Sequence, residues 1–442
     1  MQLLTISTLY PNCNDPKHGI FVKTRLRHLL NDFPEINARV IAPVPWFPLK
    51  HKVFGEYAKY ANVPAKEVID GLDVYHPKYL VIPKLGMYLT PLFMRWGISR
   101  TVRKLQKQAK IDLIDAHYFY PDGVAIAKVA KALNIPFTCT ARGTDINLVP
   151  QYPKALKMLR FVFKHANHMM TVCQALKDEM VNLGVEKDRI TVLRNGVDLQ
   201  LFKPSDDTLK QQLKAEKGIS GPLILSVGWL IERKGHYLII QALKDLPEVT
   251  LAIAGDGPDK TKLLQLAIDE AVSDRVLFLG ALSQPDVNRW MQTADMLVLA
   301  SSREGWANVL LEAMASGTPV VATKVWGTPE VVQTEDVGVL VERDVPSLTE
   351  GVKNILSKKI GENIFILTGG TLVTPPISDN VLKGITRDTV MQLAREEMSL
   401  ETVERSIDRS ELYLADECFL TGTAAHLSAV IQVDSYNIGD GE

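Results

Sequence analysis

Short apolar runs alternate with stretches of helical periodicity from the N-terminus to residue 341. Runs of this length, separated by amphipathic stretches, are typical of strands in parallel βαβ units, so the pattern predicts an α/β fold. The expected strands form two series, residues 2–7, 37–43, 111–116, 136–141, 168–172 and 190–194, then 222–228, 249–254, 275–279, 296–299, 319–322 and 338–341.

Other segments break this alternation. The polar, helix-prone stretch Asp198–Gly221 separates the two series and places a domain boundary near residues 200–220. Residues 44–100 are rich in proline and aromatic side chains, and they predict an irregular insertion followed by a helix from about residue 91 to 109. After Ser357 the alternation stops, a strand is expected at Asn363–Leu367, and a helix is expected from about Arg387.

The chain of 442 residues is long enough for two or three domains with cores of their own. We expect two Rossmann-like domains, residues 1–205 and 206–356, and an α+β segment at residues 359–442. Doubly wound sheets bind ligands at the carboxyl ends of their strands, so a site is expected in a cleft that the two domains face.

Composition is that of an ordinary soluble globular protein, with 46% hydrophobic and 23% charged residues. No apolar run approaches the roughly 20 residues of a membrane span, and the N-terminus lacks the basic region of a signal peptide. The cysteines lie far apart in the sequence, which predicts free thiols in a reducing cytoplasm: Cys13, Cys139, Cys173 and Cys418.

Charge is distributed unevenly along the chain. Residues 1–110 hold 17 Lys and Arg against 7 Asp and Glu, whereas residues 359–442 hold 6 against 14. The excess of cations includes one side of the helix predicted near residues 91–109, namely Arg95, Arg100, Arg103, Lys104, Lys107 and Lys110. This basic face is either simply solvated or meets anionic lipid headgroups on the inner face of the membrane, with nearby aromatic side chains at the interface: Trp46, Phe47, Phe93 and Trp96. Nucleic acid is disfavoured, because no nucleic-acid-binding motif accompanies the charge.

Two carboxylates, Glu304 and Glu312, flank the start of a predicted helix at residues 308–316. The backbone N–H groups of Asn308 and Val309 at that start are expected to be free to hold an anion. One carboxylate could then bind ribose hydroxyls while the other faces a sugar ring. The alternative is that Glu304 caps the helix and Glu312 belongs to its solvated face.

Glycines follow several of the predicted strands. Gly228 follows a strand and lets the backbone approach a pyrophosphate closely, while Arg233 and Lys234 supply two cations nearby. A solvated turn is the alternative for that pair. Gly19, at the end of a polar loop after the first strand, is either part of a ligand-binding loop or a plain turn glycine.

The N-terminal domain offers further polar residues at predicted strand ends. Asp115, His117 and Asp122 follow one strand, and Arg142 and Asp145 follow the next. Arg142 stays protonated, so its expected role is electrostatic or hydrogen-bonding and not that of a general base. His117 is either a titratable site residue or a half-buried structural histidine, and Asp145 is either a site residue or a helix N-cap.

These segments together resemble the family-4 retaining glycosyltransferases of the GT-B fold. The Glu-x7-Glu motif runs without a gap, and four other segments agree in order and spacing: Val192–Asp198, Leu225–Gly235, Ala254–Pro258, Glu304–Val321 and Gly327–Val332. The resemblance covers residues 1 to about 356. It implies transfer of a sugar from a nucleotide-diphosphate sugar, with retention at the anomeric carbon, to a lipid-linked or polysaccharide acceptor.

The resemblance also implies roles for single residues. It places Glu304, Arg142 and His117 at the reacting centre, and it assigns the donor to a larger set: Gly19, Gly228, Arg233, Lys234, Gly255, Asn308, Val309 and Glu312. This chain departs from the family pattern at two positions, because Arg142 stands where relatives often have His and Trp229 where many have another Arg. No Asp-x-Asp element follows a strand in residues 1–356, so transfer without a metal ion is expected.

The tail resembles the C-terminal part of branched-chain amino-acid aminotransferases, the pyridoxal-phosphate enzymes of fold type IV. Five segments match in order: Gly361–Ile366, Thr374–Pro376, Gly384–Asp388, Leu412–Glu417 and Gly422–Ala425. The resemblance implies a phosphate cup at Ile385, Thr386 and Thr423. The Schiff-base lysine would lie in the missing earlier part, and Lys358 stands where the pyridine-pairing acid is expected, so productive cofactor binding is not expected.

The sequence thus predicts a glycosyltransferase joined to an aminotransferase fragment. The alternatives are a nucleotide-sugar epimerase on the same fold and an inactive or binding-only chimera. An active aminotransferase is disfavoured by the missing lysine.

Overall fold

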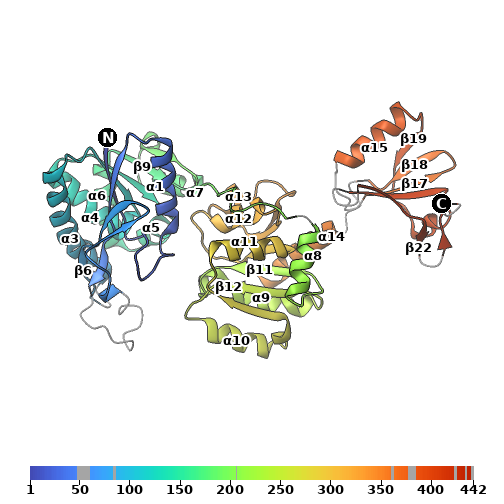
Figure 1. Cartoon of the computed structure of the whole chain (residues 1–442), viewed down its shortest axis with the longest axis horizontal. Helices are drawn as coiled ribbons and strands as arrows, with labels where there is room; N and C mark the ends of the chain where they lie inside the picture. Colours follow the sequence, from blue (N-terminus) through green and yellow to red (C-terminus); the bar gives the residue numbers. More distant parts are fainter. Residues whose placement is uncertain are drawn as a thin grey trace. The chain divides into compact units, whose positions relative to one another are not determined.

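The computed structural model describes residues 1–46, 60–82, 86–205, 207–359, 363–376, 385–422, 426–433 and 436–439. The chain divides into two compact units. The first comprises Met1–Val197 together with Ser302–Leu311 and Val325–Gln333, and the second comprises Asp198–Ser301, Glu312–Lys324 and Thr334–Glu442. Figure 1 shows the elements of each part along the chain.

The first unit is built on an eight-stranded sheet in the order β10-β9-β8-β7-β1-β2-β5-β4. Neighbouring strands are parallel except at the edge, where β4 runs antiparallel to β5. The strands are β1 (Gln2–Ile6), β2 (Asn37–Ile41), β4 (Lys66–Ile69), β5 (Leu72–Tyr75), β7 (Leu113–His117), β8 (Phe137–Ala141), β9 (His168–Thr171) and β10 (Ile190–Val192).

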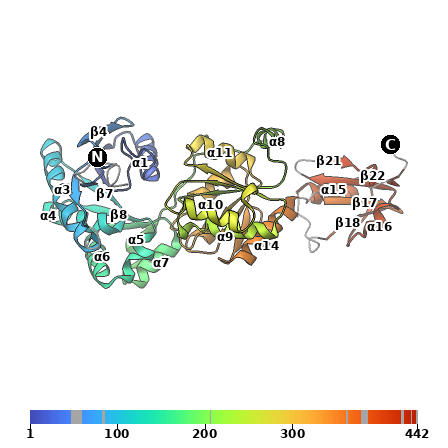
Figure 2. The ribbon, with the colours of Figure 1, turned by 90° about the horizontal axis from the view of Figure 1, so that it is seen from below.

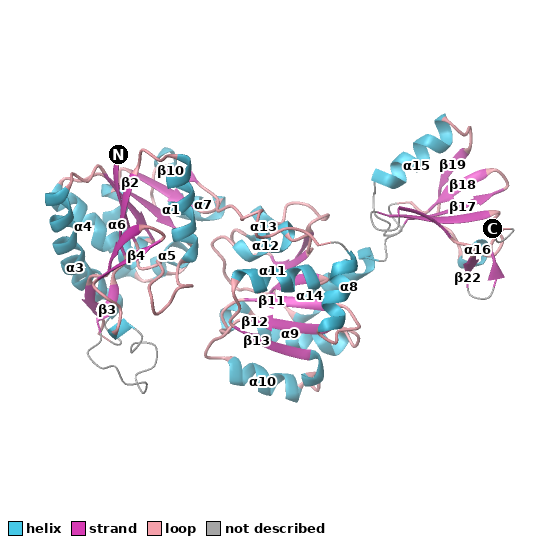
Figure 3. Cartoon of the chain, in the orientation of Figure 1, coloured by secondary structure: helices cyan, strands magenta, loops and turns pink. Residues whose placement is uncertain are grey.

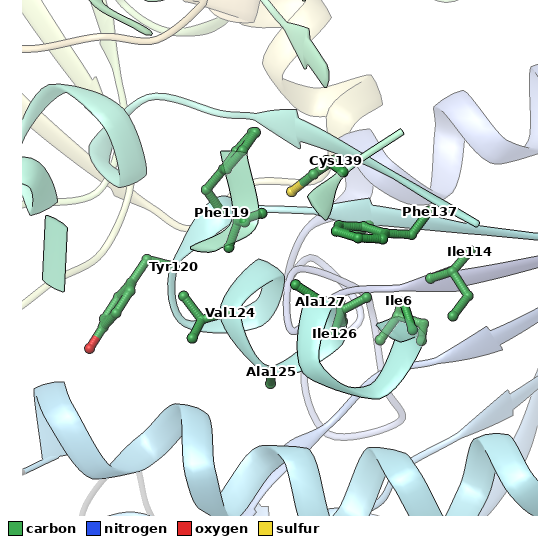
Figure 4. Packing of buried hydrophobic residues seen from close by; sticks show 14 of the residues in the cluster. Ile6, Ile114, Phe119, Tyr120, Val124, Ala125, Ile126, Ala127, Phe137 and Cys139 are labelled. Carbon is green, nitrogen blue, oxygen red and sulfur yellow. The ribbon is translucent and has the colours of Figure 1, made fainter. Parts of the chain in front are cut away.

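Helices cover both faces of this sheet. They are α1 (Ile20–Asp32), α3 (Gly86–Gln108), α4 (Val124–Leu133), α5 (Thr144–Asn147), α6 (Pro153–His165) and α7 (Gln174–Asn182). Leu3 packs with α1 on one face, whereas Leu4 and Ile6 pack with α3, α4 and α6 on the other. Figure 4 shows the core on the face covered by α3, α4 and α6, where Phe119, Phe137 and Cys139 lie against α4. Strands with apolar residues on both faces appear as continuous apolar runs, as the sequence does here.

The insertion at residues 44–100 is more regular than predicted. It contains the strands β4 and β5 and a parallel pair, β3 (Val44–Trp46) and β6 (Lys78–Leu80). The expected helix begins at Gly86 and not near residue 91, because Pro91 lies inside α3. The prediction of an irregular segment is therefore wrong for these strands, which are too short to show an alternating pattern. Phe47 lies outside the described residues.

The second unit contains a six-stranded parallel sheet in the order β13-β12-β11-β14-β15-β16. Its strands are β11 (Leu223–Val227), β12 (Thr250–Ala254), β13 (Val276–Gly280), β14 (Met296–Leu299), β15 (Val320–Thr323) and β16 (Gly338–Val341). This is the strand order of a dinucleotide-binding Rossmann sheet.

The connections of this sheet are helical, as its crossovers require. The connections are α9 (His236–Ala242), α10 (Lys260–Asp269), α11 (Gln284–Thr293), α12 (Asn308–Ala315) and α13 (Thr328–Val331). Helix α8 (Asp207–Glu216) precedes the sheet in the sequence, and α14 (Val345–Lys359) follows it. Helices α9, α10 and α14 pack into one core with apolar residues of the sheet. Figure 2 shows these helices on one side and α8 and α11 on the other.

Residues beyond 362 form a separate five-stranded sheet in the order β19-β18-β17-β20-β21. Its strands are β17 (Asn363–Thr368), β18 (Thr371–Thr374), β19 (Glu401–Glu404), β20 (Glu417–Gly422) and β21 (His426–Ala429), with α15 (Ile385–Glu396), α16 (Arg409–Leu412), β22 (Gln432–Val433) and β23 (Tyr436–Asn437) around them. Figure 3 shows this mixture of strand and helix.

The predicted fold class is confirmed: two Rossmann-like α/β sheets precede an α+β segment. Each of the twelve predicted strands appears within about two residues of its expected position. The exact domain boundaries stay a prediction. Within the described part of the chain, no helix is long and apolar enough to cross a membrane.

Candidate active site

The first sheet reverses its strand order on either side of β1, which pairs with β2 on one edge and β7 on the other. Ligands bind at such a switch point, beyond the carboxyl ends of the strands. His117 is the last residue of β7. Gly19 precedes α1 with φ of 62°, and a Cβ there would lie 2.2 Å from the backbone carbon of Leu9, so the turn requires glycine.

His117 is buried and bonded at both ring nitrogens. Its Nδ1 lies 2.7 Å from Nη2 of Arg142, and its Nε2 lies 2.9 Å from Oδ2 of Asp115. A guanidinium can only donate, so Nδ1 accepts and Nε2–H donates to the carboxylate. Burial, reinforced by the charge of Arg142, lowers the pKa of His117 despite the nearby Asp115. The ring is therefore a neutral link between two charged side chains.

Arg142 connects this histidine to a second group of residues. Its Nη1 donates to Oδ1 of Asn195 at 3.2 Å, and the guanidinium carbon lies 5.1 Å from the centre of the Phe21 ring on α1. Burial, together with the charge of Arg25, lowers the pKa of Arg142 to about 9, which leaves it protonated at neutral pH. The Nε of Arg142 is buried with no hydrogen-bond partner.

Asn195 is bonded on three sides. Besides accepting from Arg142, it donates from Nδ2 to Oδ1 of Asn308 at 3.1 Å, and its carbonyl accepts from Nε1 of Trp306 at 3.2 Å. Asn195 belongs to the segment Val192–Asp198 that carries part of the resemblance, yet sequence reasoning did not select it. The shared motif was the signal that could have found it.

The two buried aspartates at the strand ends are used inside the protein. Asp145 lies within α5 and accepts from the backbone N–H groups of Phe119, Arg142 and Gly143 at 2.8–3.1 Å. It is thus neither an N-cap nor open to a ligand, and burial raises its pKa. Asp122 accepts from the backbone N–H and the hydroxyl of Thr8, and burial raises its pKa to about 7.

The loop that carries Glu304 belongs to the first unit, within Ser302–Leu311. Glu304 is 9% exposed. The next residue, Gly305, packs directly on the backbone of Arg142, because a Cβ there would lie 2.1 Å from the Arg142 carbonyl oxygen. Glycine at this position therefore brings Glu304 close to the segment that carries Arg142.

The segment Val325–Gln333 also belongs to the first unit, and Glu330 anchors it there. Its carboxylate accepts from the backbone N–H groups of Gln174 and Ala175 at 2.8 and 2.9 Å and from Nη2 of Arg194 at 2.8 Å. These are the first amides of α7, where negative charge is favourable. The Gly327–Val332 motif thus supplies a structural carboxylate that sequence reasoning did not single out.

In the second unit, the switch point lies between β11 and β14. Gly228 follows β11, and Gly255 follows β12. A Cβ on Gly255 would lie only 1.9 Å from the carbonyl oxygen of Gly228, so the two loops touch through their backbones. The predicted donor glycines are therefore neighbours in space.

Arg233 and Lys234 lie in one turn of 3-10 helix, Glu232–Lys234. The Lys234 stem runs over Gly228, since a Cβ on Gly228 would meet its Cδ at 3.4 Å. Arg343 holds this turn, donating from Nε to the Ala300 carbonyl at 3.1 Å and from Nη2 to the Glu232 carbonyl at 3.1 Å. Arg343 was not predicted, because no motif contains it.

Trp229 and His236 border the same loop. Trp229, where relatives often have Arg, is 50% exposed. His236 is buried, with Nδ1 lying 3.0 Å from the Ser226 hydroxyl and Nε2 without a partner. Burial, followed by the charge of Lys234, lowers the pKa of His236 to about 4, so it is neutral.

The start of α12 is less open than predicted. The Asn308 N–H donates to the Trp306 carbonyl at 3.0 Å, so the prediction of a free amide is wrong there. The Val309 N–H has no such acceptor among the described residues. The Glu312 carboxylate makes no hydrogen bond or ion pair in that part of the chain, and burial raises its pKa to about 7. A carboxylate without a protein partner is stabilised by a ligand that donates hydrogen bonds to it.

In the tail, Thr386 lies in the first turn of α15, which starts at Ile385, whereas Thr423 lies outside the described residues. Arg387 is 1% exposed and donates to the Pro375 carbonyl at 2.9 Å and to Glu404 at 2.7 Å. Across the residues that the structure describes, no group of three or more His, Cys, Asp or Glu could hold a metal ion.

The chain matches three protein-family models. Residues 50–201 match Glycosyltransferase Family 4, residues 207–366 match Glycosyl transferases group 1, and residues 354–433 match Amino-transferase class IV. The first match begins after β1, β2 and β3, the second spans the six-stranded sheet, and the third overlaps the second at residues 354–366 and continues through the tail.

Individual proteins give the same division. TuaC of Bacillus subtilis (strain 168), whose name describes a glycosyltransferase of teichuronic acid biosynthesis, is 30% identical over 74% of this chain and 82% of its own length. The tail is 51% identical over 82 residues to a branched-chain-amino-acid aminotransferase of Aquifex aeolicus (strain VF5), covering 19% of this chain and 26% of that protein. The crystal structure of Anabaena Alr3699/HepE in complex with UDP and glucose shares the fold, with a TM-score of 0.61, 20% identity, and coverage of 81% and 91%.

Proposed function

Because this chain belongs to glycosyltransferase family 4 and is therefore a glycosyltransferase of the GT-B fold, we propose that its donor is a nucleoside-diphosphate sugar transferred with retention. Retention is supported by the Glu-x7-Glu segment from Glu304 to Glu312, which resembles that of retaining members of the family. The acceptor we propose is a glycan or a lipid-linked sugar. TuaC, whose name places it in teichuronic acid biosynthesis, supports this class.

One observation carries the donor assignment: the half-buried Glu312 carboxylate on α12 has no hydrogen bond or ion pair among the described residues, and desolvation raises its pKa to about 7. Burial without a partner is costly, and ribose hydroxyls would relieve it by donating hydrogen bonds. Lys234 over Gly228 and the neighbouring Arg233 supply positive charge for a diphosphate at the same switch point. HepE, which shares the fold, was crystallised with UDP and glucose.

Charge supplied by side chains also supports transfer without a metal ion. A departing nucleoside diphosphate must be neutralised as the bond to the sugar breaks, and Arg233, Lys234 and the Val309 N–H are groups of the right kind. Gly19, Gly228, Gly255 and Asn308 complete the proposed donor set.

At the reacting centre we assign Glu304 to the sugar ring and Arg142 to an oxygen of donor or acceptor. Arg142 keeps donors beyond those given to His117 and Asn195, and its Nε has no partner. His117 acts by holding Arg142, since both of its own nitrogens are occupied. A neutral histidine bonded on both sides is a poor proton acceptor for a substrate.

A basic helix supports an acceptor held at an anionic membrane surface. On α3 the cations Arg95, Arg100, Arg103 and Lys104 are exposed, as are the apolar Leu92 and Trp96, the latter by 74%. Cations beside exposed apolar side chains fit the headgroup region of anionic lipids. Vesicle flotation at low salt tests this: the chain should bind vesicles containing phosphatidylglycerol, and Arg100→Glu with Arg103→Glu should abolish the binding. Equal binding to purely zwitterionic vesicles would contradict it.

The tail is proposed to contribute no transamination. It covers only 26% of the aminotransferase that it resembles, and the Schiff-base lysine would lie outside that share. The full chain incubated with pyridoxal phosphate, leucine and 2-oxoglutarate should give no glutamate. Glutamate formation above a no-protein control would overturn this assignment.

The decisive experiment combines binding and product analysis. Thermal shifts with UDP, GDP and ADP and their glucose and N-acetylglucosamine conjugates identify the donor, because a ligand that binds the folded state raises Tm. Proton NMR of the product then reports the anomeric configuration. An inverted product would reject retention, and release of an epimer without acceptor would favour an epimerase. Binding without turnover on any glycan or lipid-linked acceptor would favour the inactive chimera.

A further inference from the structure

A chain of side-chain hydrogen bonds in the first unit runs from β7 to the first residue of α12. Its members are Asp115, His117, Arg142, Asn195 and Asn308, and its links are 2.9, 2.7, 3.2 and 3.1 Å long. All five belong to the same compact unit. The proposed function uses His117, Arg142 and Asn308 but gives Asn195 no role.

The direction of every bond in this chain follows from Arg142. A guanidinium has no acceptor, so Asn195 must turn Oδ1 towards it and Nδ2 away. Nδ2 then faces Asn308, which must present Oδ1 to receive the bond. The amide orientations of both asparagines are thus set by the donor-only chemistry of the guanidinium.

The consequence appears at Asn308. With Oδ1 committed to Asn195, its Nδ2 is directed elsewhere, and that nitrogen makes no bond among the described residues. An N–H pair offered at the start of a helix favours a ligand oxygen that carries negative charge. A histidine in place of Arg142, as relatives often have, could accept or donate and would not fix this direction.

We infer that Asn195 is a positioning residue, which relays the donor-only character of Arg142 to Asn308 so that Asn308 presents N–H groups to the diphosphate of the donor. This inference rests on the proposed function. The Trp306 indole N–H donates to the backbone carbonyl of Asn195, so it does not affect the direction of the side-chain bonds.

The informative variant is Asn195→Asp. Aspartate accepts from Arg142 at least as well as asparagine does, so the fold and Tm should be kept. It also accepts from Asn308, which must then rotate its amide and present oxygen to the diphosphate. We expect the Kd for UDP, GDP or ADP, whichever binds the parent chain, to rise by about tenfold or more. The donor KM should rise with it, while Asn195→Ala, which leaves Asn308 able to rotate, should cost less.

Two controls distinguish this relay from a loose contact and from direct charge repulsion. Trp306→Phe removes a bond to the same residue without reversing an amide, and it should change the Kd by no more than about twofold. In an Asn308→Ala background the further loss on Asn195→Asp should largely vanish. A loss that persists there is charge repulsion and overturns the inference, as does a smaller effect of Asn195→Asp than of Asn195→Ala. If the parent chain binds none of the three nucleotides, the proposed function itself fails.

Discussion

Two groups of proposed site residues, one in each Rossmann-like unit, differ in how their polar side chains are bonded. In the first, His117, Arg142 and Asp145 are bonded to one another, to Asn195 or to backbone amides. In the second, the half-buried Glu312 has no hydrogen bond or ion pair among the described residues, and the Lys234 stem extends over Gly228. Polar groups that are hydrogen-bonded to each other form a rigid support. A partly buried polar group without a partner is stabilised when a ligand forms a hydrogen bond with it.

This difference teaches which variants should alter ligand binding and which should alter stability. Substitutions in the first unit remove bonds that already exist in the folded chain. Substitutions at Glu312 and Lys234 are expected to remove interactions with the donor. The following experiments test that division, from the largest expected effect to the smallest.

Lys234→Ala should lower kcat/KM by about 10²–10³, because one preorganised charge at a developing anion contributes about that much. Tm without donor should change by only a few degrees, a smaller effect than the loss of kcat/KM. Steady-state kinetics with the donor found by thermal shift make the measurement. Lys262→Ala, on the exposed face of α10, is the matched control. A Lys234 variant that turns over like the Lys262 variant would remove Lys234 from the site.

Asp145→Ala should behave in the opposite manner. It leaves three buried backbone N–H groups without an acceptor, which costs about 1–3 kcal/mol and lowers Tm by several degrees. Well below Tm, KM for the donor should change by less than about threefold. Asp188→Ala, an exposed position, is the control for stability. An unchanged Tm together with a large rise in KM would reverse the comparison between the two units.

Glu312→Gln should separate stability from binding through pH. The folded pKa of about 7 lies above the usual unfolded value of about 4.3, so the folded state keeps a proton that the unfolded state releases. The contribution of Glu312 to stability therefore falls as pH rises from about 4.3 to 7 and stays lower above that.

The glutamine variant has no such loss, so its Tm should exceed that of the parent at pH 8 by a few degrees, and the gap should shrink towards pH 5. Donor affinity should weaken by about tenfold at pH 8, because a neutral amide accepts more weakly than a carboxylate. A gap in Tm that does not change with pH would show that Glu312 is not the titrating group.

The smallest expected effect is that of chelation. If Arg233 and Lys234 neutralise the diphosphate, excess EDTA should change the initial rate by less than about twofold. The rate with added Mg²⁺ or Mn²⁺ serves as the comparison. Loss of activity in EDTA that either ion restores would show that the second unit needs a metal in addition to its own cations.

Secondary structure was largely predictable because buried parallel strands produce apolar runs that stand out from amphipathic helices. The failure at residues 44–100 has the same cause. Strands β3 and β6 are only three residues long, and in β3 the central residue is Pro45, so neither the period nor the composition could reveal them. Pro91 suggested a helix start, but the helix continues through it from Gly86.

Sequence motifs selected the loops of the candidate site but not the state of each group. Asn308 was expected to offer its backbone amide, and the turn at Trp306 uses that amide instead. Asp145 was considered as a helix N-cap or a titratable group, yet its carboxylate binds three amides from two segments. Such outcomes depend on which atoms lie within hydrogen-bond reach, and spacing along the chain does not encode that.

The sequence alone determined that this chain joins two Rossmann-like sheets of a glycosyltransferase to part of an aminotransferase, because periodicity and ordered motifs are local properties. Only the tertiary structure decided that Arg142 meets His117, 25 residues away, and Asn195, 53 residues away, and that Asn195 in turn meets Asn308, another 113 residues on. The physical reason is that a hydrogen bond has a direction. The neighbours of a side chain in space decide whether it donates a hydrogen bond, accepts one, or has no partner in the protein and can bind a ligand.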